Sequence, residues 1–481
     1  MSLDNVVKSI QDIMRQDVGV NGDAQRIEQL AWILFLKIFS DKEKELELLE
    51  KGYKSPIPKE YRWTEWAANA EGITGEDLLE FLGKLFKELK ALKLGPTPDP
   101  RAVIIKEVFE DAHNYMKSGQ LLRQVINKVN EIDFNRKQDK HQFGDLYETI
   151  LKDLQSAGNA GEYYTPRAVT QFAVDMVDPK LGEKILDPAC GTGGFLACAI
   201  DHVRRKYVRD GKDDKKLQAS IFGSDKKPMP HLLCVTNMIL HGIEAPAQIQ
   251  RLNPLERPLR DYGPRDRVDV IVTNPPFGGQ EEPGVENNFP ATFKTRETAD
   301  LFLILVMQLL NDGGRAAIVL PDGTFFGEGV KTRIKEELLT KCNLHTIIRL
   351  PKGVFNPYAS IQTNVLFFSK GTPTKEVWYY EHPYPEGYKS YSKTKPIQIE
   401  EFAVEKAWWK KRKETSQAWK VSIDEIRERN YNLDIKNPNA PEETHEDPDV
   451  LLKQYEEAKT SAAELREGLR KALATALERK G

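Results

Sequence analysis

The sequence predicts an α/β fold in three parts: an all-helical N-terminal domain, a doubly wound sheet, and a C-terminal helical tail. Three observations predict it. Proline-free stretches with apolar residues at helical spacing fill most of the first 155 residues. Strand-type runs alternate with helical segments from about 160 to 400. A polar linker then precedes a segment with a heptad-like apolar stripe. We therefore expect domains at 1–155, 156–400 and 401–481.

The N-terminal domain is expected to be helical throughout. Residues 1–55 and 101–165 contain no proline, and the segments Pro56–Trp66 and Gly95–Pro100 are typical of connectors. Apolar side chains recur at helical spacing at Ile27, Leu30, Ala31, Leu34 and Ile38.

The middle of the chain predicts a sheet with helices on both faces. The expected strands are Lys184–Leu186, Ser220–Gly223, Val268–Val272, Ala316–Leu320, Leu344–Leu350 and Val365–Ser369. The last two are expected to form an antiparallel hairpin.

A glycine-rich turn follows the first expected strand. Asp187 ends this strand, the turn Gly191-Thr192-Gly193-Gly194 comes next, and an apolar helix begins at Phe195. Ligands of doubly wound sheets bind at such turns, and glycine lets the backbone approach them closely. No Lys-Ser/Thr pair follows, so the turn is not a phosphate-binding P-loop. An acid beside bare backbone favours a zwitterionic ligand with an ammonium group, such as S-adenosylmethionine.

The second strand also ends in an acid. Asp225 lies 38 residues after Asp187, where acids of dinucleotide-binding sheets accept hydrogen bonds from ribose hydroxyls. An acid at this point is also a common helix cap, and a helix from Pro230 to His241 is expected to follow.

The third strand ends in Asn274-Pro275-Pro276-Phe277. The two prolines stop the strand, because they lack N–H donors and have fixed φ. The Asn274 side-chain oxygen and the Pro275 carbonyl are then two fixed acceptors, and Phe277 adds an aromatic face. This combination suits a planar ring with an NH₂ group, such as a nucleobase with an exocyclic amine.

The tail is expected to pack against another helix. After the linker at 441–449, apolar or small residues recur at Tyr455, Ala458, Ala462, Leu465, Leu469, Ala472 and Ala476. The partner helix is either part of this chain or part of another protein.

Composition limits the possible partners and locations. The formal net charge is −3, from 70 basic and 73 acidic residues, which is unusual for a protein that grips DNA alone. The apolar runs Leu30–Phe39 and Leu301–Leu310 are too short to span a bilayer. The N-terminus does not read as a signal peptide, and four scattered cysteines without a C-x-x-C pair indicate a reduced, cytoplasmic protein. The eight histidines form no H-E-x-x-H pattern, so no metal site is expected.

The order of these motifs resembles a known family. Gly161-Glu-Tyr-Tyr-Thr-Pro-Arg167, the Asp187 turn, Gly223-Ser-Asp225 and Asn274-Pro-Pro-Phe277 resemble amino-methylating DNA methyltransferases of the class that acts on adenine. Further segments resemble the methylation subunit of type I restriction–modification systems, over roughly residues 1–440: Ile27–Lys37, Gly313–Gly323, Ile348–Phe355, Gln362–Phe368 and Asn430–Asn437.

The resemblance implies a Rossmann-like methyltransferase sheet and a set of site residues. Asn274, Pro275, Pro276 and Phe277 would hold and stack the adenine, which must be flipped out of duplex DNA. The methionine end of the cofactor, S-adenosylmethionine, would lie against Glu162, Tyr163, Tyr164, Thr165, Pro166 and Arg167. Asp187, Gly191, Thr192, Gly193 and Gly194 would shape the cofactor loop. Asp225 would hold the ribose and Asn253 would meet the cofactor's adenine.

The resemblance also implies partners: double-stranded DNA, a restriction/translocase subunit, and a specificity subunit that binds two copies of this chain and on which the tail docks. Two alternatives remain, a protein-glutamine methyltransferase of the same fold and a non-catalytic scaffold. A cytosine ring-carbon methyltransferase would need a nucleophilic cysteine, usually after a proline, and no Pro-Cys pair occurs.

Overall fold

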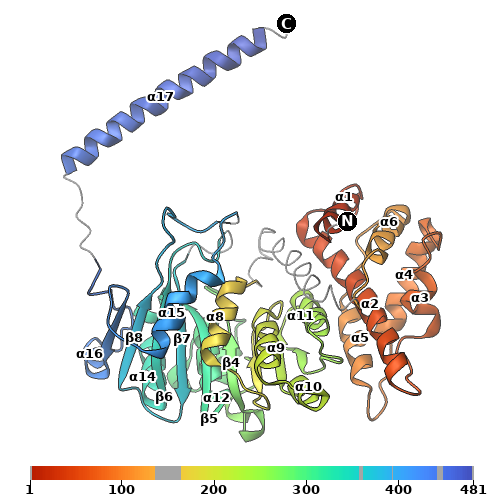
Figure 1. Ribbon diagram of the computed structural model, residues 1–481, viewed down its shortest axis with the longest axis horizontal. Helices are drawn as coiled ribbons and strands as arrows, with labels where there is room; N and C mark the ends of the chain where they lie inside the picture. The colour runs from red at the N-terminus through yellow and green to blue at the C-terminus, as the bar shows by residue number, and fades with distance from the viewer. Residues whose placement is uncertain (1–2, 136–163, 357–360, 393, 441–447, 479–481) are drawn as a thin grey trace. The chain divides into compact units, whose positions relative to one another are not determined.

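The central sheet lies between two layers of helices (Figure 1). The computed structural model describes residues 3–135, 164–356, 361–392, 394–440 and 448–478. Within these ranges the sheet has nine strands in the order β3-β2-β1-β4-β5-β7-β6-β8-β9. The strands are β1 (Ile185–Asp187), β2 (Ile221–Asp225), β3 (Ile249–Arg251), β4 (Val268–Thr273), β5 (Leu310–Pro321), β6 (Cys342–Leu350), β7 (Thr363–Lys370), β8 (Glu376–Glu381) and β9 (Ala418–Ser422).

The strand pairing creates a crevice where ligands can bind. β3, β2, β1, β4 and β5 run parallel. The chain order reverses at β1, which has β2 on one side and β4 on the other. Ligands of doubly wound sheets bind past the carboxyl ends of strands at such a switch point, and both Asp187 and the start of the Asn274 turn lie there.

The expected hairpin is confirmed. β7 lies antiparallel between β5 and β6, with Ile348 opposite Val365 and Leu350 opposite Thr363. Three strands were not predicted: β3, β8 and β9. β8 pairs in parallel with β6, and β9 pairs antiparallel with β8, so they widen the sheet beyond the expected hairpin.

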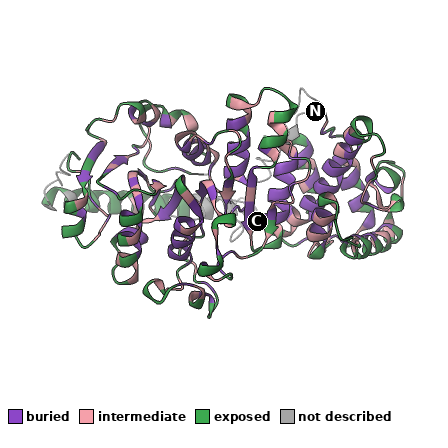
Figure 2. Cartoon of the chain, turned by 90° about the horizontal axis from the view of Figure 1, so that it is seen from below, coloured by how far each residue is buried: buried purple, intermediate pink, exposed green. Residues whose placement is uncertain are grey.

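Two cores cover the two faces of the sheet because side chains alternate along each strand. In β4, Val270 and Val272 join the core that includes α8 and α9, whereas Ile271 joins the core that includes α12 and α14. The strands are accordingly buried in Figure 2. The covering helices are α8 (Arg167–Val177), α9 (Gly194–Tyr207), α10 (Gly211–Gln218), α11 (Pro228–Leu240) and α15 (Ala403–Lys410), and α12 (Thr298–Leu309), α13 (Asp322–Phe326), α14 (Val330–Lys341) and α16 (Ile423–Glu428).

The N-terminal residues are helical, as expected. The helices are α1 (Leu3–Met14), α2 (Asp23–Leu49), α3 (Trp63–Trp66), α4 (Gly75–Lys90), α5 (Pro100–Glu110) and α6 (Gly119–Asn130). α2 is buried on nearly every side over Leu30–Phe39. It packs on α6 and on α11 of the sheet region, and an ion pair between Asp111 and Arg251 links the same two regions.

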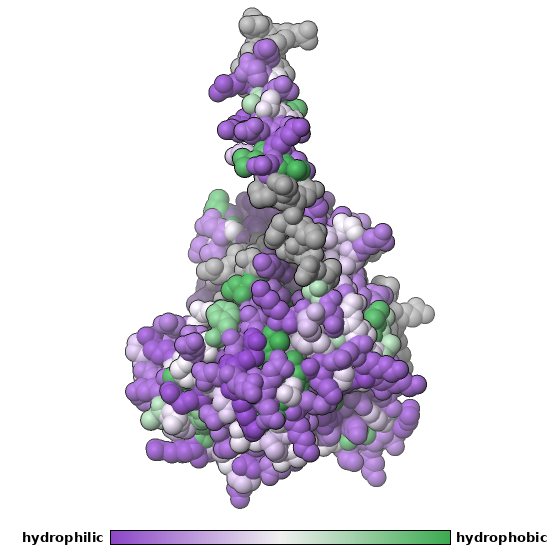
Figure 3. Space-filling view, turned by 90° about the vertical axis from the view of Figure 1, so that its left-hand side faces the viewer, coloured by the Kyte–Doolittle hydropathy of each residue, from purple (hydrophilic) through white to green (hydrophobic). Residues whose placement is uncertain are grey.

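The tail forms a separate unit. Residues up to Asn437 form one compact unit, and Pro438–Gly481 form a second. The second unit contains the single long helix α17 (Pro448–Glu478). Tyr455, Leu465 and Leu469 are exposed on it at 65–71 %, and Figure 3 shows hydrophobic side chains among hydrophilic ones along this helix.

None of the helices in the described ranges is long and apolar enough to cross a membrane.

Candidate active site

The glycine turn connects β1 to α9. Gly191 and Gly193 have φ of 51° and 81°, in the left-handed region that favours glycine. A Cβ at Gly193 would lie 2.8 Å from Cys234 Sγ and 3.1 Å from Met238 Cε. Gly193 is therefore constrained by packing against α11, and it is not among the residues that line the cavity described below.

Asp225 fixes this turn from the neighbouring strand. Its Oδ2 accepts a hydrogen bond from the Gly191 backbone N–H at 3.1 Å, and its Oδ1 accepts one from the Lys227 N–H at 2.8 Å. Asp187 accepts from the Ala189 N–H at 3.1 Å. Both acids thus shape the backbone of the turn as well as facing the cavity.

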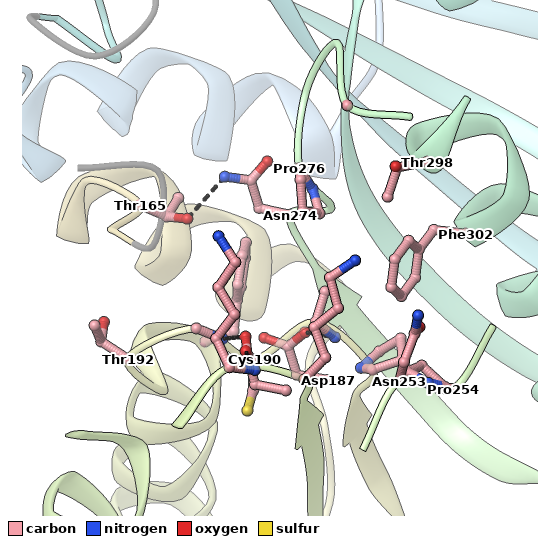
Figure 4. A pocket seen from close by; sticks show the side chains of 18 of the residues that line it. Thr165, Asp187, Cys190, Thr192, Asn253, Pro254, Asn274, Pro276, Thr298 and Phe302 are labelled. Carbon is pink, nitrogen blue, oxygen red and sulfur yellow. Dashed lines mark hydrogen bonds between the residues drawn. The ribbon is translucent and has the colours of Figure 1, made fainter. Parts of the chain in front are cut away.

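A cavity of about 220 Å³ lies where these loops meet (Figure 4). Thr192 lies on one side of it, and Asn253, Thr298 and Phe302 lie together on the other. The sequence-predicted residues that line it are Thr165, Asp187, Gly191, Thr192, Gly194, Asp225, Asn253, Asn274 and Pro276. The fold therefore gathers residues from four separate motifs around one cavity.

The remaining predicted residues either lie around this cavity without lining it or fall outside the residues that the structure describes. Glu162 and Tyr163 fall outside the described residues. Tyr164 is buried. Arg167 donates to the Gly194 carbonyl at 3.1 Å, so it holds the start of α9. Pro166, Pro275 and Phe277 do not line the cavity either. The Phe277 ring packs edge-on against Phe355, with ring centroids 5.5 Å apart.

One hydrogen bond holds the Asn274 amide. Its Nδ2 donates to Thr165 Oγ1 at 2.9 Å, as the dashed line in Figure 4 shows. Its Oδ1 is shielded from solvent and has no hydrogen-bond partner in the described part of the chain. Buried polar atoms almost always have partners. This oxygen is therefore an acceptor placed for a donor that the described part of the chain does not supply.

Burial raises the pKa of both acids above the usual value for an aspartate. Desolvation raises the pKa of Asp187 to about 7, with the Asp225 charge adding to the shift. Desolvation also raises the pKa of Asp225 to about 6, although the N–H groups of Lys227 and Gly191 oppose the shift. A cationic ligand would favour the ionised form of both carboxyls.

Seven lining residues lie outside the motifs that the sequence analysis singled out: Lys226, Lys227, Gly279, Gln280, Glu281, Thr298 and Phe302. Glu281 is buried in the turn that follows Phe277 and accepts from Lys226 and Thr298. Its sequence context, Gln280-Glu281-Glu282, is that of an ordinary polar loop. Only the neighbouring motif could have drawn attention to it.

The cysteines are core residues, as expected. Cys190, Cys198, Cys234 and Cys342 are all buried and form no disulfide, and Cys190 also lines the cavity. Within the described ranges, no group of three or more His, Cys, Asp or Glu side chains is placed to hold a metal ion.

Comparison with known families adds two matches. Residues 138–447 match the N-6 DNA methylase family, and residues 3–129 match the HsdM N-terminal domain. The chain is 61 % identical to the methylase subunit of the type I restriction enzyme EcoEI from Escherichia coli, over 99 % of both chains.

Solved structures agree. A modification subunit from Vibrio vulnificus YJ016 has a TM-score of 0.81 and 46 % identity, and covers 91 % of this chain and 97 % of that one. A chain from a structure describing complex assembly and conformational transition of the type I restriction–modification system also has a TM-score of 0.81, with 36 % identity and 98 % coverage of both chains.

Proposed function

The chain belongs to the methylation subunits of type I restriction–modification systems, a family of N6-adenine DNA methyltransferases, and from that premise we propose that the cavity binds S-adenosylmethionine and that Asn274 holds the target adenine. The methyltransferase family sets aside both alternatives, the protein-glutamine methyltransferase and the non-catalytic scaffold. The observation that carries the proposal is the Asn274 amide at the edge of the cavity, whose Oδ1 is buried and has no partner among the residues that the structure describes.

The cavity residues suit this cofactor. Asp225 can accept from ribose hydroxyls, and the backbone of Thr192 and Gly194 can approach the ligand closely. Asp187 and Asp225 have raised pKa values, at about 7 and about 6, and a ligand carrying ammonium and sulfonium charges would return both to the carboxylate form. When bound, S-adenosylmethionine supplies a methyl group on a sulfonium, which an amine nitrogen can attack directly.

Asn274 would make the adenine amine a better nucleophile. The lone pair of N6 is delocalised into the ring, so attack requires a more pyramidal nitrogen. Asn274 Oδ1 and the Pro275 carbonyl would each accept one N6 hydrogen and stabilise the positive charge that develops there. Thr165 holds the amide in place, because its hydroxyl accepts from Nδ2. The fixed strand end also aligns the nitrogen with the cofactor side of the cavity.

The adenine reaches this position by leaving the duplex. A stacked, paired base exposes neither face, so enzymes of this kind flip the base outward. Phe277 is half-buried and braced by Phe355, which suits a ring on which the flipped base stacks.

Partners would supply the DNA sequence preference. We propose that a specificity subunit binds two copies of this chain, that a restriction/translocase subunit joins the complex, and that the assembly acts in the cytoplasm. The exposed apolar side chains Tyr455, Leu465 and Leu469 of α17 support a docking role for the tail, since isolated exposed helices of this kind pack on partner helices.

Two measurements on the complex with its specificity subunit test the proposal. Transfer of a labelled methyl group to duplex DNA, followed by mapping of N6-methyladenine, tests the reaction. 2-Aminopurine at the target position tests flipping, because its fluorescence rises when it leaves the stack. If the cofactor is bound at full occupancy and no labelled N6-methyladenine is found, the role assigned to Asn274 is refuted.

A further inference from the structure

A buried carboxylate in the cavity has no role in the reaction described above. Glu281 is 3 % exposed, and three side chains donate to it. Lys226 Nζ lies 3.0 Å from Oε2 and 3.3 Å from Oε1, Asn253 Nδ2 lies 3.1 Å from Oε2, and Thr298 Oγ1 lies 3.0 Å from Oε1. Both carboxylate oxygens are therefore surrounded by donors.

These contacts join three loops that line the cavity. Lys226 follows Asp225 at the end of β2, Asn253 follows β3, and Thr298 begins α12. Asn253 and Thr298 lie on the same side of the cavity in Figure 4. The backbone of Glu281 is fixed as well: its N–H donates to the Arg296 carbonyl at 2.8 Å, and the Arg296 guanidinium donates back to its carbonyl.

Glu281 determines which way the Asn253 amide faces. Nδ2 donates to Glu281, and Oδ1 accepts from the Leu255 N–H at 3.1 Å. A flipped amide would place an NH₂ against an N–H and a carbonyl against a carboxylate. In the fixed orientation the amide keeps the capacity for one further donated and one further accepted bond. That pair matches the amine and an adjacent ring nitrogen of adenine.

We propose that Glu281 is a positioning residue. It holds Asn253 and Lys226 in place so that this end of the cavity prefers a cofactor that carries adenine over one that carries another base. It also connects this end of the cavity to the loop that carries Asn274. The proposal rests on the proposed cofactor site. The tie is short, since Glu281 lies seven residues after Asn274 and Thr298 N–H donates to Gly279 in the same loop.

Glu281→Gln is a sharp test because the change preserves shape and removes acceptor capacity. Both carboxylate oxygens face donors, so the new NH₂ group opposes a donor in either orientation. The Thr298 hydroxyl can rotate to accept from it, but Lys226 cannot. Replacing Lys226 in the same protein should therefore relieve the conflict. Glu282→Gln is the matched control, since Glu282 is exposed next in the chain.

The measurement is calorimetric titration of the complex with S-adenosylhomocysteine and with its analogue in which hypoxanthine replaces adenine. We expect Glu281→Gln to raise the Kd for the adenine ligand at least about tenfold, the scale of a lost charged hydrogen bond. The preference over the hypoxanthine analogue should shrink. Glu282→Gln should match the wild type in both respects.

A merely structural role would give a different pattern. If Glu281 only stabilised the fold, the two ligands would lose affinity equally and their ratio would stay at the wild-type value, which would overturn the proposal. So would an equal effect of Glu281→Gln in the wild-type and Lys226→Met backgrounds. If Glu281→Gln does not fold, Asn253→Ala must reduce the same ratio. A wild-type complex that binds neither ligand would refute the cofactor site itself as well.

Discussion

At the scale of single residues, the proposed role of Asn274 depends on one hydrogen bond. Thr165 and Asn274 lie 109 residues apart in sequence, and their contact gives the amide a defined orientation. Without the Thr165 hydroxyl, the amide would lose this contact and could turn its NH₂ group toward the proposed substrate amine. The methyl acceptor would then meet a donor, and the charge that develops on its nitrogen would be opposed.

We expect Asn274→Ala to lower the methylation rate by about 10²–10³-fold, the cost of removing one preorganised polar group from a transition state. Cofactor affinity should stay within about threefold of wild type, because Asn274 is proposed to hold the base and not the cofactor. Labelled-methyl transfer and calorimetry measure the two quantities.

Thr165 provides the matched comparison for that prediction. Thr165→Ser keeps the acceptor and should keep most of the rate, whereas Thr165→Val keeps the shape and should lower kcat. Equal rates for the two variants would show that the Thr165 hydroxyl does not orient Asn274.

The acids of the cavity predict proton release on cofactor binding. Burial raises the pKa of Asp187 to about 7 and that of Asp225 to about 6. Because these folded-state values exceed those of the unfolded chain, the two groups favour the folded, empty protein at low pH. This contribution is lost as the pH rises through about 6 to 7.

A cationic ligand lowers both pKa values, so binding should release protons and tighten as the pH rises toward 7. Calorimetry near pH 6.5 in two buffers of different ionisation enthalpy measures the released protons. Identical binding enthalpies in both buffers would contradict the prediction.

At the scale of elements, the sequence predicted those that carry a motif or a long apolar run. β1, β2 and β4 end in Asp187, Asp225 and the Asn274 turn, and all three were expected from their patterns. β3 was missed because only Ile249 in its three residues is apolar. β8 and β9 were missed because their pairing partners are distant, and only the sheet order shows which strands they extend.

Contacts between elements could not be predicted from the sequence for the same reason. No local pattern places Glu281 beside Asn253 and Thr298, since those contacts depend on how three loops meet. The division at residue 400 stays a prediction, although β9 (Ala418–Ser422) pairs with β8 beyond it.

The glycine turn predicts a stability effect that its motif alone would not. Gly193→Ala places a Cβ 2.8 Å from Cys234 Sγ at a φ of +81°. The left-handed conformation alone costs a non-glycine residue about 1–2 kcal/mol, and the contact with α11 adds to it. We expect a lower Tm together with weaker cofactor binding.

Gly182→Ala separates the two contributions. Gly182 has a φ of +90°, but nothing lies within 4 Å of the added Cβ. Its Tm should fall less than that of Gly193→Ala. If thermal denaturation shows equal losses, close packing against α11 does not constrain the turn.

At the scale of the whole molecule, the chain has a catalytic site but lacks the charge of an independent DNA-binding protein. Its formal net charge is −3, whereas DNA affinity rests mainly on neutralised phosphates. We propose that a partner that holds the DNA resolves this difference and that it docks on α17. Residues up to Asn437 form their own compact unit, so the tail can be altered without disturbing the cavity.

We therefore expect deletion of residues 450–481 to release the specificity subunit while cofactor binding survives. Leu465 and Leu469 are 68 % and 71 % exposed, and burying one such side chain contributes about 1.5–3 kcal/mol. The double variant Leu465→Gln/Leu469→Gln should then weaken the complex in size-exclusion chromatography at micromolar concentration.

Arg466→Gln/Arg470→Gln is the control, because it introduces the same residues one position along the helix. If the leucine variant and the deletion both leave the complex intact, the partner is held by another surface. If the isolated chain methylates a specific sequence efficiently, it needs no partner for recognition. That result would contradict both the DNA-holding partner inferred from the net charge and the docking role of α17.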